Sequence, residues 1–265
     1  MAKRRPKLLF LLTLVAIVIA AVELGQCESD KEHLHPHPTQ CTVTYSITKL
    51  LIGSKEITIE IYRPVEKGKY PLIVMLHGAQ GVYTRLGNRM PMVDNFGEKQ
   101  IAQNCYVVAL PHYFDLIDRK SVIDVQTLRD SFGRLFTGLR EIIAVLRYDS
   151  DVQRSSVGLY GESYGGFLAV ALATRIASVR ALSEYSGGYP DGYTFHRVPE
   201  EVLIQHGYRD QLVPVAEAYS LRDDFLRHRC KVHLWIYHDQ SHYFDAATRS
   251  LVLSRTIAFF NGALR

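Results

Sequence analysis

The sequence predicts an α/β protein with one mostly parallel sheet of about eight strands, helices on both faces and no large cap domain. Strand-like and helix-like segments alternate over residues 70–263. Residues 70–76 are apolar throughout, which is typical of a strand buried on both faces of a parallel sheet. The longest segments without a regular pattern, residues 112–120 and 186–200, are too short to form a separate cap.

Two segments of a different kind precede the buried strand. Residues 41–49 alternate Thr and Ser with Val, Tyr and Ile, and residues 57–62 alternate again before Arg63-Pro64. A period of two indicates a strand with one exposed face, so the pair predicts a hairpin at an edge of the sheet.

The remaining elements follow in turn along the chain. Apolar residues recur at a helical period in residues 121–148, the longest predicted helix. The predicted helices are 94–104, 121–148, 166–173, 215–228 and 245–263. The predicted strands after residue 76 are 106–110, 156–160, 179–185, 202–205 and 232–237. Reactive side chains are expected on loops at the carboxyl ends of these strands.

The residues Gly161-Glu162-Ser163-Tyr164-Gly165 stand between a short apolar strand and a helix rich in small residues. The pattern Gly-x-Ser-x-Gly in this context is typical of a nucleophile elbow, a sharp turn with the serine at its tip. Glycines are needed there because neighbouring backbone passes close to the turn. Since the bare pattern also occurs by chance, the flanking strand and helix carry the prediction that Ser163 is a nucleophile.

A serine hydroxyl needs a base to take its proton, and the base needs an acid to orient it. After such an elbow the expected chain order is Ser, then Asp or Glu, then His. Asp210 follows the second-last predicted strand and His242 follows the last one. We therefore predict the catalytic set Ser163, Asp210 and His242. The alternatives, which we expect to be supporting or surface residues, are His206, His238 and Asp239.

Two backbone N–H groups are expected to stabilise the oxyanion. One belongs to Tyr164, directly after the nucleophile. The other is expected from the glycine-containing loop 77–81, and we assign it to Ala79. Removal of one such donor typically lowers the rate by a factor on the order of 10²–10³.

The first 26 residues have the pattern of a targeting segment. Basic residues at 3–7 precede an apolar run at 8–22. That run suits a signal-peptide core of ~7–15 residues better than a membrane span of ~20, so a cleaved signal peptide is favoured over a signal anchor. We expect a secreted or extracytoplasmic protein, or a membrane-anchored form if the leader is retained. Residues 27–41 form a polar linker rich in His and Pro, and residues 42–265 form the catalytic domain.

The formal net charge of +4 is concentrated in the leader. Four Lys and Arg side chains against Glu23 place +3 in residues 1–26, which leaves +1 for the rest of the chain. A nucleic-acid partner is therefore not expected.

The four cysteines are Cys27, Cys41, Cys105 and Cys230. An exported protein can form disulfides, and the expected pairing is Cys41 with either Cys27 or Cys105. No paired Cys or His spacing of a metal site is present, so neither a metal nor a cofactor is expected.

Several segments together carry a family resemblance. They are Leu76-His77-Gly78, residues 110–115, residues 161–166, residues 206–214 and Ser241-His242-Tyr243-Phe244. From about Lys49 to the C-terminus the chain resembles an α/β-hydrolase of the dienelactone hydrolase family. The resemblance implies the α/β-hydrolase fold and a serine hydrolase.

Three positions depart from the family pattern. Ser163 stands where dienelactone hydrolases have a cysteine, and Gly78 stands where they have a glutamate. The family's substrate-binding arginine is absent near Leu116 and Ile117. Dienelactone itself is therefore not the expected substrate.

The expected function is hydrolysis of small carboxylic esters, with a small-molecule ester as the partner; the oligomeric state is not predicted. A peptidase resembling the prolyl-oligopeptidase catalytic domain is the first alternative, although fewer than twenty residues between leader and first strand leave no room for a propeller. A catalytically inactive binding protein on the same scaffold is the second alternative. The predicted pocket residues are His77, Gly78, Gln80, Tyr113, Phe114, Tyr185 and Tyr243, with Tyr189 and Tyr193 as further aromatic candidates for an aryl-ester pocket.

Overall fold

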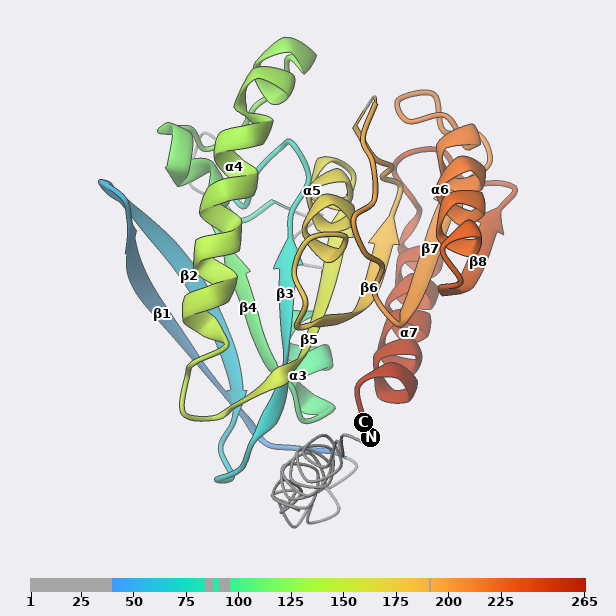
Figure 1. Ribbon diagram of the computed structural model, residues 1–265. Coiled ribbons are helices and arrows are strands. Elements are labelled where there is room, and N and C mark those ends of the chain that lie inside the picture. Colours follow the sequence, from blue (N-terminus) through green and yellow to red (C-terminus); the bar gives the residue numbers. More distant parts are fainter. Residues whose placement is uncertain (1–39, 84–87, 91–95, 191) are drawn as a thin grey trace, which may run out of the picture. The chain divides into compact units, whose positions relative to one another are not determined.

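An eight-stranded sheet forms the centre of the described part of the chain (Figure 1). The strand order is β1-β2-β4-β3-β5-β6-β7-β8. Strand β2 pairs antiparallel with β1 and with β4, and the other pairings are parallel. The strands are β1 (Val43–Ile52), β2 (Lys55–Pro64), β3 (Tyr70–Leu76), β4 (Val107–Pro111), β5 (Val152–Glu162), β6 (Val179–Tyr185), β7 (Glu201–Gly207) and β8 (Lys231–Tyr237). The predicted mostly parallel sheet with an edge hairpin is confirmed.

Helices cover both faces of the sheet, as predicted. Figure 1 shows α4, α5 and α6 in front of the sheet and α3 and α7 behind it. Each face has its own apolar core, with Leu139 of α4 and Phe225 of α6 in one and Phe260 of α7 in the other. The helices are α3 (Glu98–Gln103), α4 (Val125–Leu146), α5 (Tyr164–Ala173), α6 (Ala216–Arg227) and α7 (Ala246–Ala263).

The computed structural model describes residues 40–83, 88–90, 96–190 and 192–265. The predicted leader, residues 1–26, and nearly all of the linker lie outside these ranges. Within them, no helix has both the length and the hydropathy that a membrane crossing requires.

Two predicted boundaries are corrected by the structure. The segment 112–120, predicted as irregular, contains a 3-10 helix, η1 (Tyr113–Ile117). The long helix predicted from residue 121 begins at Val125, because Asp124 caps it: the Asp124 side chain accepts a hydrogen bond from the Thr127 backbone N–H at 2.7 Å. Residues 121–123 are thereby left as an extended loop beside the functional site.

A disulfide joins Cys41 to Cys105, one of the two predicted pairings. It connects the chain just before β1 to the turn between α3 and β4. Cys230 is a free, buried cysteine, and burial raises the pKa of its thiol to about 12. A thiol with so high a pKa stays protonated and unreactive at neutral pH.

Candidate active site

Ser163 lies at the tip of the turn between β5 and α5. Its φ of 51° is in the left-handed region, which a non-glycine residue adopts only when the surrounding structure enforces it. The Ser163 backbone N–H donates to the Tyr185 carbonyl at 2.9 Å, which ties the turn to the end of β6. A Cβ atom on Gly165 would lie 2.1 Å from the Leu76 carbonyl oxygen, so only glycine fits there. The predicted sharp strand-to-helix turn is therefore present.

The structure brings Ser163, His242 and Asp210 together from three loops. His242 Nε2 lies 3.0 Å from Ser163 Oγ, and His242 Nδ1 lies 2.7 Å from Asp210 Oδ2. The loops that carry them follow β5, β7 and β8, whose carboxyl ends meet at one edge of the parallel sheet. Both His242 and Asp210 are buried.

The carboxylate of Asp210 accepts hydrogen bonds on both oxygens. Its Oδ1 accepts from the backbone N–H groups of Leu212 and Val213, at 2.8 and 2.9 Å. Its Oδ2 faces His242 and lies 3.3 Å from His206 Nε2. Burial alone would raise the pKa of Asp210, but the hydrogen bonds from the two histidines and the backbone outweigh it and hold that pKa well below its usual range. Asp210 is therefore a fixed negative charge beside His242.

The loop after β3 lies directly beside the serine. A Cβ atom on Gly78 would be 3.5 Å from Ser163 Cβ. The Gly81 N–H donates to the Gly78 carbonyl at 3.1 Å and closes a tight turn, and the Ala79 carbonyl is fixed by the Val122 N–H at 2.8 Å. Within the described ranges, the backbone N–H groups of Ala79 and Tyr164 have no hydrogen-bond partner. The assignment of these two N–H groups as oxyanion donors stays a prediction.

The buried side chain of His77 holds this loop in place. Its ring stacks on Tyr113 with centroids 4.0 Å apart, and its Nδ1 donates to the Gly78 carbonyl at 2.8 Å. Burial lowers the pKa of His77 to about 3, so the ring is neutral. The Tyr113 hydroxyl donates to the His77 carbonyl at 2.5 Å. These contacts hold the loop that carries Ala79.

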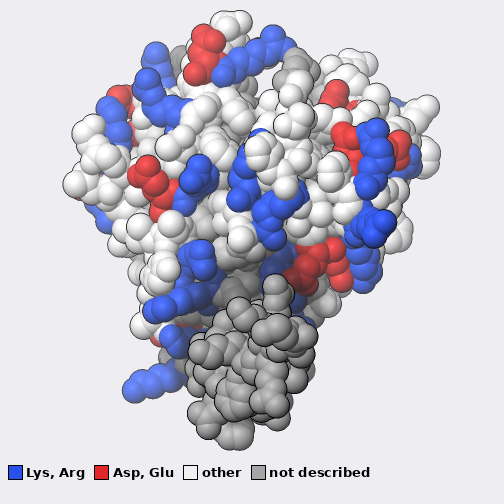
Figure 2. Space-filling view, in the orientation of Figure 1, with Lys and Arg blue, Asp and Glu red and all other residues white. Residues whose placement is uncertain are grey.

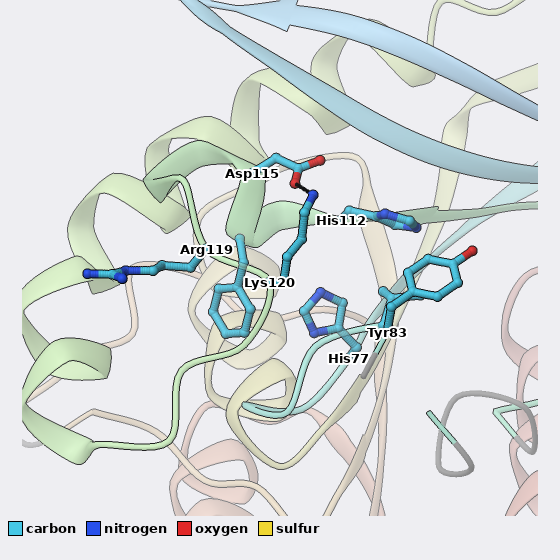
Figure 3. A pocket seen from close by; sticks show the side chains of 8 residues that line it. His77, Tyr83, His112, Asp115, Arg119 and Lys120 are labelled. Atoms are coloured by element: carbon cyan, nitrogen blue, oxygen red, sulfur yellow. Dashed lines mark hydrogen bonds and ion pairs between the residues drawn. The ribbon is translucent and has the colours of Figure 1, made fainter. Parts of the chain in front are cut away.

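A small cavity lies on the far side of His77 (Figure 3). Figure 3 shows Tyr83 and His112 beside the His77 ring, with Lys120 reaching to Asp115 across the cavity. Its volume of about 10 Å³ is no more than one water molecule requires. This cavity is therefore not a substrate site.

A much larger cleft of about 940 Å³ opens over Ser163 and His242. Met90 lines the cleft, and the guanidinium of the neighbouring Arg89 donates to both oxygens of buried Glu60 at 2.7 Å. Most of the lining is apolar. The apolar side chains that line it are Ala79, Met90, Ile123, Val125, Leu128, Phe132, Tyr164, Phe167, Tyr189, Pro190, Leu212, Val213, Pro214 and Tyr243.

The predicted pocket residues divide into two groups. Gly78, Gln80 and Tyr243 line the cleft, as does Tyr189. The other members belong to the core: Tyr113, Phe114 and Tyr185 are buried and, like His77 and Tyr193, are not among the described residues that line the cleft. Their assignment to the pocket is corrected, because these side chains pack into the two cores: Tyr113 contacts Phe114 in one, and Tyr185 contacts Phe244 in the other.

Sequence reasoning missed one wall of the cleft. Val125, Leu128 and Phe132 belong to the helical period predicted for residues 121–148, and the structure places them in the first turns of α4, where they line the cleft. Ile123 and Val125 are 79% and 62% exposed. The apolar period alone does not distinguish residues that cover the sheet from residues that line the cleft.

Three charged side chains line the cleft: Glu162, Glu217 and Arg129. Burial raises the pKa of Glu162 to about 7, against the opposing charge of Arg249. Elsewhere on the surface seen in Figure 2, Lys and Arg side chains are interspersed with Asp and Glu and with broad uncharged areas.

The alternative catalytic residues lie away from the serine, with one exception. Asp239 is 84% exposed and forms an ion pair with Arg209, and the exposed His238 lies against the Tyr208 ring. His206, in contrast, is fully buried and touches Asp210. In the part of the chain that the structure describes, no group of three or more His, Cys, Asp or Glu side chains could hold a metal ion.

Comparisons with known proteins agree with this architecture. A dienelactone hydrolase from Anabaena variabilis is 19% identical, with a TM-score of 0.67; the match covers 84% of this chain and 99% of that one. A dienelactone hydrolase-like promiscuous phosphotriesterase from metagenomic libraries is 17% identical over 84% of this chain and 99% of its own, with a TM-score of 0.69. An acylaminoacyl peptidase from Pyrococcus horikoshii matches 84% of this chain with 42% of its own, at 16% identity and a TM-score of 0.63.

At these identities the solved structures establish the fold alone, which is that of the α/β-hydrolases. A search of curated proteins finds no match. The dienelactone hydrolase family, however, matches residues 57–260, a range that runs from β2 almost to the end of α7 and contains the whole Ser163, Asp210 and His242 arrangement. The chain therefore belongs to the dienelactone hydrolase family and is a hydrolase.

Proposed function

We propose that the protein is a serine hydrolase that cleaves carboxylic esters through an acyl-enzyme intermediate. The observation that carries this proposal is the unbroken hydrogen-bond line from Asp210 through His242 to Ser163, with contacts of 2.7 and 3.0 Å, at the floor of an open cleft. A nucleophile, a base within reach of its proton and an acid that orients the base are the three groups that acyl transfer to serine requires.

The first half of the reaction forms the acyl-enzyme. Ser163 Oγ attacks the ester carbonyl carbon while His242 Nε2 takes the hydroxyl proton. Asp210 stabilises the imidazolium that results, and the N–H groups of Ala79 and Tyr164 donate to the oxyanion. When the tetrahedral intermediate collapses, the bond to the alcohol oxygen breaks and His242 gives its proton to the departing alcohol.

The second half releases the acid. A water molecule attacks the acyl carbon as His242 takes one of its protons, and the second intermediate collapses to the carboxylic acid and free Ser163. His242 returns its proton to Ser163 Oγ, so no proton is gained or lost by the enzyme over the cycle.

The cleft favours esters with an apolar acyl or alcohol group. Its lining is mainly aliphatic and aromatic, and a volume of about 940 Å³ is at the upper end for a small-molecule site. We therefore propose neutral esters, aryl esters among them, rather than a dienelactone.

We also propose that the protein works outside the cytoplasm. The support is twofold: the leader pattern of residues 1–26, and the disulfide between Cys41 and Cys105, which persists in oxidising compartments and is rare in reducing ones.

Site-directed variants and a covalent probe test the catalytic assignment. Ser163→Ala is expected to lower kcat for a p-nitrophenyl ester by a factor of ~10⁴–10⁶ and to abolish labelling by a fluorophosphonate. Asp210→Asn is expected to lower kcat by ~10⁴, because an amide can no longer hold the correct tautomer of His242. Asp239→Asn is the matched control, an exposed aspartate one loop away, and is expected to change kcat less than twofold.

Two outcomes would overturn the proposal. Labelling that persists in Ser163→Ala would identify another nucleophile. Absence of labelling and of turnover in the unaltered protein would favour an inactive binding protein. Peptide amides assayed beside the esters address the peptidase alternative, for which cleavage of amides at rates comparable to esters is the diagnostic result.

A further inference from the structure

Two buried ionisable residues next to the catalytic set have no role in the mechanism above. Glu184, near the end of β6, and His206, near the end of β7, are both 0% exposed. Glu184 Oε1 and His206 Nδ1 are among the few buried side-chain atoms in the described residues that have no hydrogen-bond partner. An unpartnered buried polar atom is costly, so two of them on neighbouring strands require an explanation.

The sheet register places these side chains on the same face. Glu184 pairs with Ile204, and His206 is two residues further along the same strand as Ile204. Because side chains alternate between faces along a strand, Glu184 and His206 project to the same side and are diagonal neighbours. That side is covered by α5 and α6 (Figure 1).

The carboxylate of Glu184 lies directly beneath the nucleophile turn. Its Oε2 accepts the Gly187 backbone N–H at 2.8 Å. Cβ atoms on Gly166 and Gly187 would lie 3.3 and 2.8 Å from that oxygen, and a Cβ on Gly187 would lie 3.1 Å from the Ser163 carbonyl oxygen. The backbone around this carboxylate is therefore close, and Gly187, which follows β6, has no room for a Cβ atom unless the carboxylate moves.

His206 connects Glu184 to the catalytic acid. Its Nε2 donates to the Val213 carbonyl at 2.9 Å and lies 3.3 Å from Asp210 Oδ2, the oxygen that also faces His242. Nε2 therefore carries a proton in either charge state. Its Nδ1 has no hydrogen-bond partner among the described residues, and the ring is an imidazolium when Nδ1 also carries a proton.

Charges from every neighbouring element act on this ring. Asp210 from the loop after β7 and Glu184 from β6 favour the imidazolium, His242 lies across the Asp210 carboxylate, and Glu217 of α6 reaches the same layer at Gly188. Burial opposes protonation, but the Asp210 hydrogen bond and the Glu184 charge outweigh it and raise the pKa of His206. Burial raises the pKa of Glu184 to about 7 despite the charge of His206. The pKa of each group is therefore raised above its ordinary value.

We propose that His206 is protonated beside Asp210, that the nearby carboxylate of Glu184 helps to keep it charged, and that this imidazolium offsets the charge of Asp210 and so tunes His242. Both are positioning residues that act through Asp210 and do not touch the substrate. The inference rests on the proposed function, since it assigns them a part in the Ser163, His242 and Asp210 mechanism.

A charged His206 affects how the activity depends on pH at the acid end of the range. With Asp210 partly neutralised, His242 is less strongly stabilised as an imidazolium and stays available as a base at lower pH. Replacing Glu184 by Gln removes the partner that keeps His206 charged, and replacing His206 by Gln removes the charge itself. In both variants His242 is expected to hold its proton to higher pH.

Nitrogen NMR of the histidine rings tests this without turnover. In the unaltered protein, the His206 ring is expected to remain an imidazolium to a higher pH than a free imidazole does. In Glu184→Gln and in His206→Gln, the His242 titration midpoint is expected to rise by about 0.5–1 pH unit, and the acid limb of kcat/KM for a p-nitrophenyl ester to rise with it. The double variant is expected to shift no further than His206→Gln alone, because both changes remove the same charge. His238→Gln, at an exposed histidine one loop away, is the control and is expected to shift neither.

The outcomes separate the two proposals. A His206 ring that stays neutral between pH 5 and pH 9 in the unaltered protein overturns the inference even if neither variant folds. The inference is also overturned if a variant lowers kcat/KM equally at every pH and leaves the His242 titration midpoint unchanged. Such a result would mean that the replaced residue has only a structural role. If the His242 midpoint rises as expected but no ester is hydrolysed and Ser163 is not labelled, the proposed function fails, while the inferred effect of Glu184 and His206 on His242 stands.

Discussion

Glu162, the residue before Ser163, is a buried carboxyl group that lowers the free energy of unfolding at neutral pH. Its side chain is buried, and its pKa is raised from the ordinary value of 4.5 to about 7. As pH rises between these values, the unfolded chain loses the Glu162 proton while the folded protein keeps it. The folded state then binds more protons, so the free energy of unfolding falls over this interval. The loss approaches about 3 kcal/mol, at 1.36 kcal/mol per pKa unit.

Replacing Glu162 by Gln is expected to remove this pH dependence. Gln has nearly the same shape and no charge, so the stability of the variant relative to the unaltered protein should increase from pH 4.5 to pH 7.5 by up to about 3 kcal/mol. Urea unfolding at several pH values measures the difference. Two stability curves that run parallel over this range would show that Glu162 is ionised in the folded protein at ordinary pH.

The single residues that the sequence reveals are those with a local signature. Ser163 could be predicted because glycines on both sides and a strand-to-helix change mark it, and Asp210 and His242 because each follows a predicted strand in a known order. Glu184 and His206 have no such signature, since their meaning lies in burial and in a diagonal contact across two strands. Tyr113 and Tyr185 were misassigned for the same reason: a strand end does not reveal whether its side chain points to the cleft or to the core.

At the scale of elements, the β5–α5 turn depends on close backbone contact. A Cβ atom on Gly161 would lie 2.4 Å from the Gly165 carbonyl oxygen, and one on Gly165 would lie 2.1 Å from the Leu76 carbonyl oxygen. The neighbours are backbone atoms of β3 and of the turn itself, which cannot rotate away as a side chain would. Helix α5 therefore approaches the sheet closely enough to direct its N-terminal N–H groups at the site.

Gly165→Ala is expected to lower the free energy of unfolding by ~3 kcal/mol or more and to displace Ser163. Gly262→Ala is the matched control: it is also a helical glycine, in α7, but an added Cβ there meets nothing within 4 Å. Since alanine is the better helix former, that variant should gain up to ~1 kcal/mol. Urea denaturation of both measures the contrast, and equal stability of the two variants would refute the close-approach argument.

The long helix α4 shows why an element can be predicted and its role still missed. Apolar residues recur at a helical period from Val125 to Leu146, which indicates the helix correctly. The period does not reveal where the sheet beneath it ends. Leu135, Leu139 and Ile142 are buried in the core, while Leu128 and Phe132 line the cleft. One apolar stripe therefore serves both the core and the substrate site.

For the molecule as a whole, the order of strands brings the catalytic loops together. Ser163, Asp210 and His242 are separated by up to 79 positions, yet they follow the strands β5, β7 and β8 on one side of the same parallel sheet. The opposite half of the sheet ends in the antiparallel hairpin of β1 and β2, far in strand order from these loops. That half is where the disulfide closes a segment of 64 residues between Cys41 and Cys105. The three candidate catalytic residues thus lie in one half of the sheet, and the disulfide lies in the other half.

The disulfide gives a prediction that joins stability to export. Closing a segment of 64 residues restricts the unfolded chain enough to stabilise the fold by about 4 kcal/mol on entropic grounds. Protein produced with residues 1–26 and recovered from an oxidising compartment is expected to lack the leader and to yield linked Cys41 and Cys105 peptides. The Cys41→Ala/Cys105→Ala variant is expected to have a Tm several degrees lower than that of the unaltered protein. Cys230→Ala is the control, because that cysteine is unpaired and its removal should leave the Tm shift on reduction unchanged. An extracytoplasmic site of action would be contradicted if the full-length protein stayed in the cytoplasm with both thiols free and a Tm that does not respond to reductant. That result would not bear on the proposed serine chemistry, which is tested separately.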